Sequence, residues 1–111
     1  MKIAFQNVRS INDEKTIFLR SLLKDFDYLC LSELNKLYDF NKPSVNDNEF
    51  QYHTNPATSR IGVMASNTSK FEFVSIGIQL EQERFQTDKS VIQTNLYKIT
   101  ENKRTIYFEN V

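Results

Sequence analysis

The sequence has one cysteine, two glycines and no net charge, and each of these shortages excludes a class of protein or site. One cysteine rules out an internal disulfide and leaves no cysteine and histidine cluster for a zinc site. Two glycines are too few for a glycine-rich loop that wraps a phosphate group. No apolar run approaches the roughly 20 residues of a membrane span, and the first residues lack the pattern of a signal peptide. We therefore expect a soluble intracellular protein with no membrane partner.

Charge is balanced, with 14 basic and 14 acidic residues. A net charge of zero removes the bulk attraction to nucleic acid or membrane, although it leaves room for a local basic patch. The length of 111 residues and the 40% share of hydrophobic residues fit one small globular domain over residues 1–111. Nine phenylalanines and five tyrosines favour strands.

The first third of the chain predicts a strand, a helix and a second strand. Residues 2–8 are typical of a buried strand, and Asn12 is a good N-cap for the helix that follows. The apolar residues of this helix share one face: Leu19, Leu22, Leu23 and Phe26. Residues 28–31 form a continuous apolar run, typical of a strand covered on both faces. The three elements predict a βαβ unit with parallel strands.

The remainder predicts a loop and then successive strands. Residues 35–48 are polar and irregular, with a helical turn expected around residues 37–40. Strands are expected at Glu49–Thr54, Ile61–Ser66, Lys70–Leu80, Ser90–Thr100 and Arg104–Val111, the last two joined by a hairpin turn. The apolar alternation slips by one residue after Phe73, which predicts a β-bulge. The fold class is therefore α/β, in the sense of α+β, with a βαβ unit followed by mostly antiparallel strands. Because the last strand still resembles core, we expect the chain to be part of something longer.

Two polar residues stand where the predicted parallel strands end. Asn7 closes the first strand and Glu33 follows the second, so the topology brings both to the edge where open α/β sheets bind ligands. A carboxylate after a buried strand is tolerated if it reaches solvent or coordinates a cation, and Mg²⁺ commonly takes one or two protein carboxylates. Asn7 can hold Glu33 or a phosphate oxygen by hydrogen bonds. The alternative is that Glu33 caps the next turn and Asn7 merely ends a strand.

Two separated motifs carry a family resemblance. Residues 6–11 read QNVRSI and residues 27–33 read DYLCLSE, with the amphipathic helix between them. This pattern resembles the N-terminal signature of the endonuclease/exonuclease/phosphatase superfamily, and most of all the apurinic-type endonuclease domain of non-LTR retrotransposons. Residues 60–67 (RIGVMASN) resemble a later strand of that family, with Arg60 and Ile61 in place of its usual glycines. The resemblance covers the whole chain but only the front half of the family domain.

The resemblance implies a metal-dependent phosphodiesterase that nicks DNA within a four-layered α/β sandwich. Glu33 matches the metal-binding glutamate, for Mg²⁺ or Mn²⁺, and Asn7 matches the asparagine that supports the metal and the scissile phosphate. Arg9, Arg60 and Asn67 are candidate substrate-binding residues. An RNA or another phosphate ester is an alternative substrate within the same family, and a nuclear location follows if the chain derives from a retroelement.

The family's later motifs, among them a catalytic histidine with its aspartate, have no counterpart in these residues. His53 matches none of those positions, so we expect a surface or hydrogen-bonded histidine, and we expect Cys30 to behave as a small core hydrophobe. Whether the isolated chain is an enzyme therefore stays open. The alternative is a truncated, inactive copy or a small α/β binding module. In either case we expect self-association, or a partner that supplies the missing C-terminal half.

Overall fold

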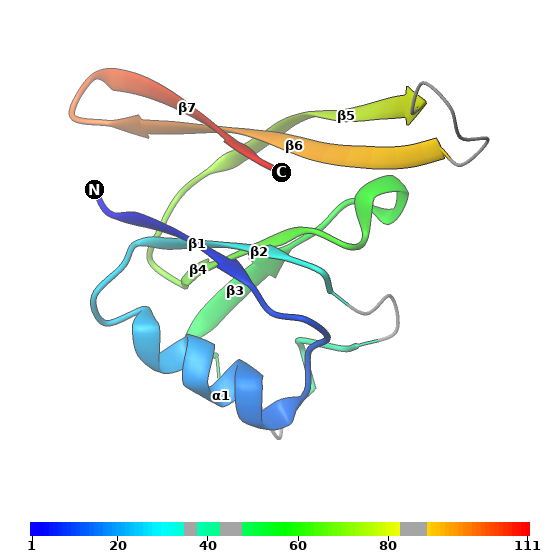
Figure 1. The fold of residues 1–111 in the computed structure, drawn as a ribbon. Coiled ribbons are helices and arrows are strands. Elements are labelled where there is room, and N and C mark those ends of the chain that lie inside the picture. The colour runs from blue at the N-terminus through cyan, green and yellow to red at the C-terminus, as the bar shows by residue number, and fades with distance from the viewer. Residues whose placement is uncertain (35–37, 43–47, 83–88) are drawn as a thin grey trace.

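The computed structural model describes residues 1–34, 38–42, 48–82 and 89–111. Its elements are β1 (Ile3–Asn7), α1 (Asp13–Leu22), β2 (Tyr28–Ser32), β3 (Phe50–His53), the short 3₁₀ helix η1 (Pro56–Thr58), β4 (Gly62–Ser66), β5 (Glu72–Gln82), β6 (Lys89–Glu101) and β7 (Arg104–Asn110). Figure 1 shows three layers, with α1 below a first sheet and a second sheet above it. The first sheet has the order β1-β2-β4-β3, and the second has the order β5-β6-β7. The predicted α+β class is confirmed.

The βαβ unit forms as the sequence predicts. β1 and β2 run parallel, with Ile3 opposite Tyr28 and Asn7 opposite Ser32. The Asn12 side chain accepts a hydrogen bond from the Lys15 backbone N–H at 2.9 Å, which caps α1 at its first turn. α1 ends at Leu22, earlier than the apolar spacing predicts, so Leu23 is its C-cap and Phe26 lies beyond the helix. The four expected apolar residues still pack on the first sheet: Leu19 is buried, and Leu22, Leu23 and Phe26 are partly buried.

The prediction that the first strand is buried is wrong. β1 lies at the end of the first sheet and has one neighbour, whereas β2 lies between β1 and β4. The side chain of Phe5 is therefore 63% exposed, while the four apolar residues 28–31 are buried as expected. Strand order decides this difference, and the composition of a five-residue strand does not reveal it.

Two hydrophobic clusters cover the two faces of the first sheet. Alternate residues of β2 point to opposite faces, so Leu29 and Leu31 pack toward α1 while Tyr28 and Cys30 pack toward the second sheet. The cluster between the sheets also includes Tyr97 from β6 and Phe108 from β7. Stacking of these last two rings, with centroids 5.2 Å apart, joins the inner sides of both strands.

The later strands also follow the sequence pattern. The register between β5 and β6 shifts between Phe73 and Ser75, which confirms the predicted bulge. Asn102 and Lys103 both have positive φ, 50° and 64°, as a tight two-residue hairpin turn requires. Asparagine thus serves at a turn where glycine is common. The helical turn expected at residues 37–40 lies in part outside the described residues, and residues 38–40 are not helical.

Candidate functional site at the carboxyl edge of the first sheet

Asn7 and Glu33 lie at the same end of the first sheet. We call this end the carboxyl edge, because β1 and β2 end there (Figure 1). Asn7 lies opposite Ser32 in the parallel register. Beyond that pair, the Val8 N–H donates to the Ser32 carbonyl at 3.1 Å and the Ser10 N–H donates to the Glu33 carbonyl at 3.0 Å. Backbone pairing therefore continues past both strand ends and brings the two predicted residues together.

The backbone at Glu33 is strained and held in place. Its φ is 55°, in the left-handed region that costs a residue with a Cβ about 1–2 kcal/mol. The Glu33 carbonyl accepts from Ser10, and the Leu34 N–H donates to the Arg60 carbonyl at 2.9 Å. These bonds turn the chain sharply after the buried strand and leave the Glu33 side chain exposed. Strain of this kind concentrates at functional sites.

The Asn7 side chain fixes the loop that follows β1. Its Oδ1 accepts a hydrogen bond from the Arg9 backbone N–H at 3.1 Å, which leaves the amide N–H groups as the free face of the side chain. The Lys15 ammonium group donates to the carbonyls of Val8, Arg9 and Ser10 at 2.8–3.1 Å. The Asn7 side chain and the Lys15 ammonium group together hold residues 8–10 in place. This matters because Arg9 and Ser10 both have positive φ, which is unfavourable for residues with a Cβ.

Arg60 belongs to this edge and Asn67 does not. The Arg60 carbonyl bonds to Leu34, next to Glu33, and the arginine side chain is exposed. β4 runs antiparallel to β2, so the segment before β4 lies at the carboxyl edge and the segment after it lies at the opposite end. Asn67 follows β4, and its N–H donates to the Glu49 carbonyl at 3.3 Å. A role for Asn67 in the same site does not fit this topology.

The sequence patterns do not predict two buried asparagines on the second sheet, close to the carboxyl edge of the first. Asn110 at the end of β7 is 1% exposed, and its Nδ2 donates to the carbonyls of Gly62 at 2.9 Å and Leu31 at 3.4 Å. Its register partner Asn95 is also buried, and accepts from the Thr58 hydroxyl at 2.6 Å. Their burial follows from the alternation of each strand, because each asparagine lies on the same, inward-facing side as the buried apolar residues of its strand. Asn110 thus ties the second sheet to β2 and β4, the strands next to Glu33 and Arg60.

His53 and Cys30 take the ordinary roles expected of them. His53 Nδ1 lies 2.8 Å from the Tyr97 hydroxyl, and partial burial lowers the pKa of the imidazole. Burial raises the pKa of the Tyr97 hydroxyl as well. Cys30 packs between the sheets, and burial raises the pKa of its thiol to about 12. A thiol with this pKa is unreactive at neutral pH.

The donor set at the edge fits part of a magnesium site. Glu33 supplies one accessible carboxylate, and Mg²⁺ commonly binds one or two carboxylates and completes its octahedron with water and phosphate oxygens. Over residues 1–34, 38–42, 48–82 and 89–111, no group of three or more histidine, cysteine, aspartate or glutamate side chains is arranged to hold a metal ion. In the same ranges no helix is long and apolar enough to cross a membrane.

Comparisons with known proteins support the fold and are silent on activity. No protein-family model matches the sequence, and no curated protein matches it. A solved structure, that of a functionally unknown conserved protein from Enterococcus faecalis V583, matches with a TM-score of 0.54 and 14% sequence identity. The match covers 100% of this chain and 52% of that chain, so this chain spans about half the length of its structural neighbour.

Proposed function

We propose that the chain is the N-terminal part of a metal-dependent phosphodiesterase domain that nicks DNA. The observation that carries the proposal is the carboxyl edge, where Asn7 and Glu33 meet across paired strand ends and Glu33 occupies a strained turn. The two sequence motifs that resemble the endonuclease/exonuclease/phosphatase superfamily contain these same two residues. A structural neighbour almost twice as long is consistent with a larger domain of which this chain forms one half.

Each residue of the edge has a distinct task in this proposal. The exposed Glu33 carboxylate holds Mg²⁺ or Mn²⁺, and the bound ion supplies charge stabilisation to the phosphate. The free amide face of Asn7 donates to a phosphate oxygen, because its Oδ1 is already engaged by Arg9. The exposed guanidinium groups of Arg9 and Arg60 attract the neighbouring phosphates of the DNA strand.

None of the residues assigned a role at the carboxyl edge acts as the general base that removes a proton from the attacking water. His53 closes β3 at the same end of the first sheet, but its Nδ1 lies 2.8 Å from the Tyr97 hydroxyl in the packing between the sheets. In the proposed intact domain, the other half supplies the general base and the remaining metal ligands. Loss of a general base typically costs a factor of 10² to 10⁴ in rate, so we expect the 111-residue chain to be a weak nuclease at best.

Nicking of supercoiled plasmid tests the proposal. The purified chain is incubated with Mg²⁺, with Mn²⁺ and with a chelator, beside Glu33→Gln and a matched control, Glu101→Gln. Glu101 is an exposed glutamate next to the β6–β7 hairpin turn. We expect metal-dependent nicking that falls about tenfold or more in Glu33→Gln and is unchanged in the control. Titration of Mn²⁺ into the same proteins measures metal binding separately from cleavage.

Two outcomes would count against this function for the chain. Equal nicking by the wild type and Glu33→Gln would assign the activity to a contaminant. Absence of both metal-dependent nicking and Glu33-dependent Mn²⁺ binding would favour the alternative, a truncated copy or a binding module. Replacement of the DNA by RNA or a small phosphate ester distinguishes the substrates that the family resemblance leaves open.

A further inference from the structure

We propose that the exposed edge of β1 pairs with β1 of a second copy of this chain, so that two first sheets join into one continuous sheet. This interaction surface consists of the outward backbone groups of Ile3, Phe5 and Asn7, with the side chains of Phe5 and Phe18 on either side. We call it the β1 edge. It is independent of the chemistry proposed for Glu33.

The backbone of β1 presents half of its hydrogen-bonding groups to the open side. The Val8 N–H donates to Ser32, and the Lys2 carbonyl accepts from Asp27 at 2.9 Å and from Tyr28 at 3.3 Å, so these even-numbered residues face β2. Alternate residues of a strand direct their N–H and C=O groups to opposite sides. Ile3, Phe5 and Asn7 therefore direct theirs away from β2, at the end of the sheet. The exposed side chain of Gln6 reaches the Asn7 carbonyl at 3.3 Å, on this open side.

This edge lacks the features that keep sheet edges apart. The five residues of β1 include no charge, no proline and no glycine, and the register with β2 is uninterrupted. The other edge strands of the two sheets differ from it. β3 has only four residues, β5 has a bulge, and β7 carries Arg104 and Glu109. An uncharged, regular edge is the one that pairs with another chain.

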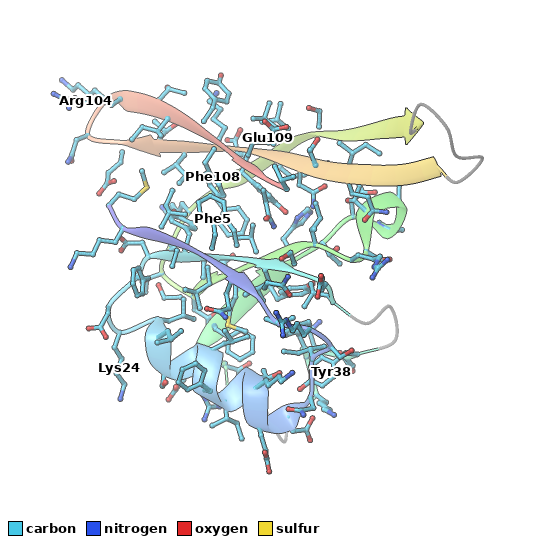
Figure 2. The ribbon with its side chains drawn as sticks, in the orientation of Figure 1. Phe5, Lys24, Tyr38, Arg104, Phe108 and Glu109 are labelled. Carbon is cyan, nitrogen blue, oxygen red and sulfur yellow. The ribbon has the colours of Figure 1, made fainter. Side chains whose placement is uncertain are left out.

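Apolar side chains flank the edge on both faces of the sheet. Phe5 is 63% exposed, on the face of β1 that looks toward the second sheet (Figure 2). On the other face, Gln6, Asn7 and Val8 line a cleft of about 230 Å³ together with Lys15, Phe18 and Leu19 of α1. Phe18 in this cleft is 60% exposed. A strand added at the β1 edge would cover both aromatic rings.

The position of Phe5 favours a second copy as the partner. Phe5 is the central residue of β1, so a two-fold axis beside it pairs Phe5 with Phe5 and Ile3 with Asn7 in an antiparallel arrangement. All three outward-facing residues then lie in hydrogen-bonded positions and form about six backbone bonds. The two phenylalanine rings become direct cross-strand neighbours, which adds to the pairing. A chain of zero net charge meets no bulk repulsion from its copy.

Sedimentation equilibrium over a range of protein concentrations tests the pairing. We expect a reversible dimer whose dissociation constant rises about tenfold or more in Phe5→Lys, which adds a charge to the edge. Phe5→Pro is the second variant, because it removes an outward N–H that β2 does not use. Tyr107→Lys is the matched control, since Tyr107 is an equally exposed aromatic residue (58%) on β7. Circular dichroism verifies that each variant is folded.

Hydrogen exchange identifies the surface directly. On raising the concentration of the wild type, exchange should slow at the amides of Ile3, Phe5 and Asn7, and not in the β6–β7 hairpin turn. A wild type that stays monomeric at all concentrations would overturn the proposal. A dimer that persists in both Phe5 variants would also overturn it, because a surface other than the β1 edge would then hold the two copies together.

Discussion

Replacement of Asn110 by aspartate tests how strongly the Asn110 hydrogen bonds join the second sheet to the first. The Asn110 amide donates to two carbonyl oxygens, of Gly62 and Leu31, at a position that is 1% exposed. Aspartate has nearly the same shape but offers oxygen in place of the N–H donor. A buried carboxylate would therefore face two carbonyl oxygens with no counter-charge.

The expected cost follows from burial and from the number of bonds. Asn110→Ala loses two hydrogen bonds, one of them long, which amounts to about 2 kcal/mol of stability. At a change of roughly 4 °C per kcal/mol for a chain of this size, the melting temperature should fall by about 8 °C. Asn110→Asp should cost about 3–5 kcal/mol at pH 7, because an unpaired charge is buried as well.

The pH dependence of this variant has a definite sign. Burial without a counter-charge raises the pKa of the new carboxyl group in the folded state above its ordinary value of about 3.9. The folded state then binds the proton more tightly than the unfolded state does. The deficit relative to wild type is therefore greatest at neutral pH and shrinks as the pH falls through the folded pKa. The protonated group can donate to the Gly62 carbonyl and restore one bond.

Urea unfolding followed by circular dichroism at pH 7 and pH 5 measures both effects. Asn102→Asp is the matched control, because it makes the same chemical change at an exposed turn position, where we expect a change within about 0.5 kcal/mol. The reasoning would be refuted if Asn110→Asp were as stable at pH 7 as Asn110→Ala, or if its deficit did not shrink at lower pH.

Two further predictions concern the packing on either side of the first sheet. Gly62→Ala should destabilise the fold by about 1–3 kcal/mol in urea unfolding, because an added Cβ would collide with the Tyr52 hydroxyl and lie 2.6 Å from its ring carbons. A loss below about 0.5 kcal/mol would show that Tyr52 moves aside freely. Cys30, whose thiol pKa is raised to about 12 by burial, should resist a colorimetric thiol reagent at pH 8 in the native protein and react promptly in urea. Equal reaction rates in the two conditions would contradict its burial.

The local patterns of the sequence were sufficient to predict most elements of the fold. The N-cap at Asn12, the helical spacing from Leu19 and the apolar run at 28–31 each act over a few residues, so the βαβ unit follows from them. The same is true of the bulge after Phe73. Because parallel strands end at the same edge of a sheet, the meeting of Asn7 and Glu33 was predictable from topology alone.

Properties that depend on strand order were not predictable in this way. β1 and β2 are similarly apolar, yet only β2 gains neighbours on both sides, so Phe5 is exposed. The motif at residues 60–67 predicts that Asn67 belongs to the site, but the antiparallel direction of β4 places Asn67 at the opposite end of the sheet. The bonds of Asn110 to the first sheet cross 79 and 48 positions of the sequence, which no local pattern reveals.

The two proposals share β1 but place separate demands on it. In the antiparallel dimer the carboxyl ends of the two β1 strands point in opposite directions, so the two Glu33 side chains lie at opposite ends of the joined sheet. One copy therefore cannot supply metal ligands or a general base to the site of the other. It follows that any nicking by the dimer is carried out by each copy alone, and Phe5→Lys should lose the dimer while retaining that activity. Under the proposed function, completion of the site would require a different polypeptide segment, one that reaches the carboxyl edge itself.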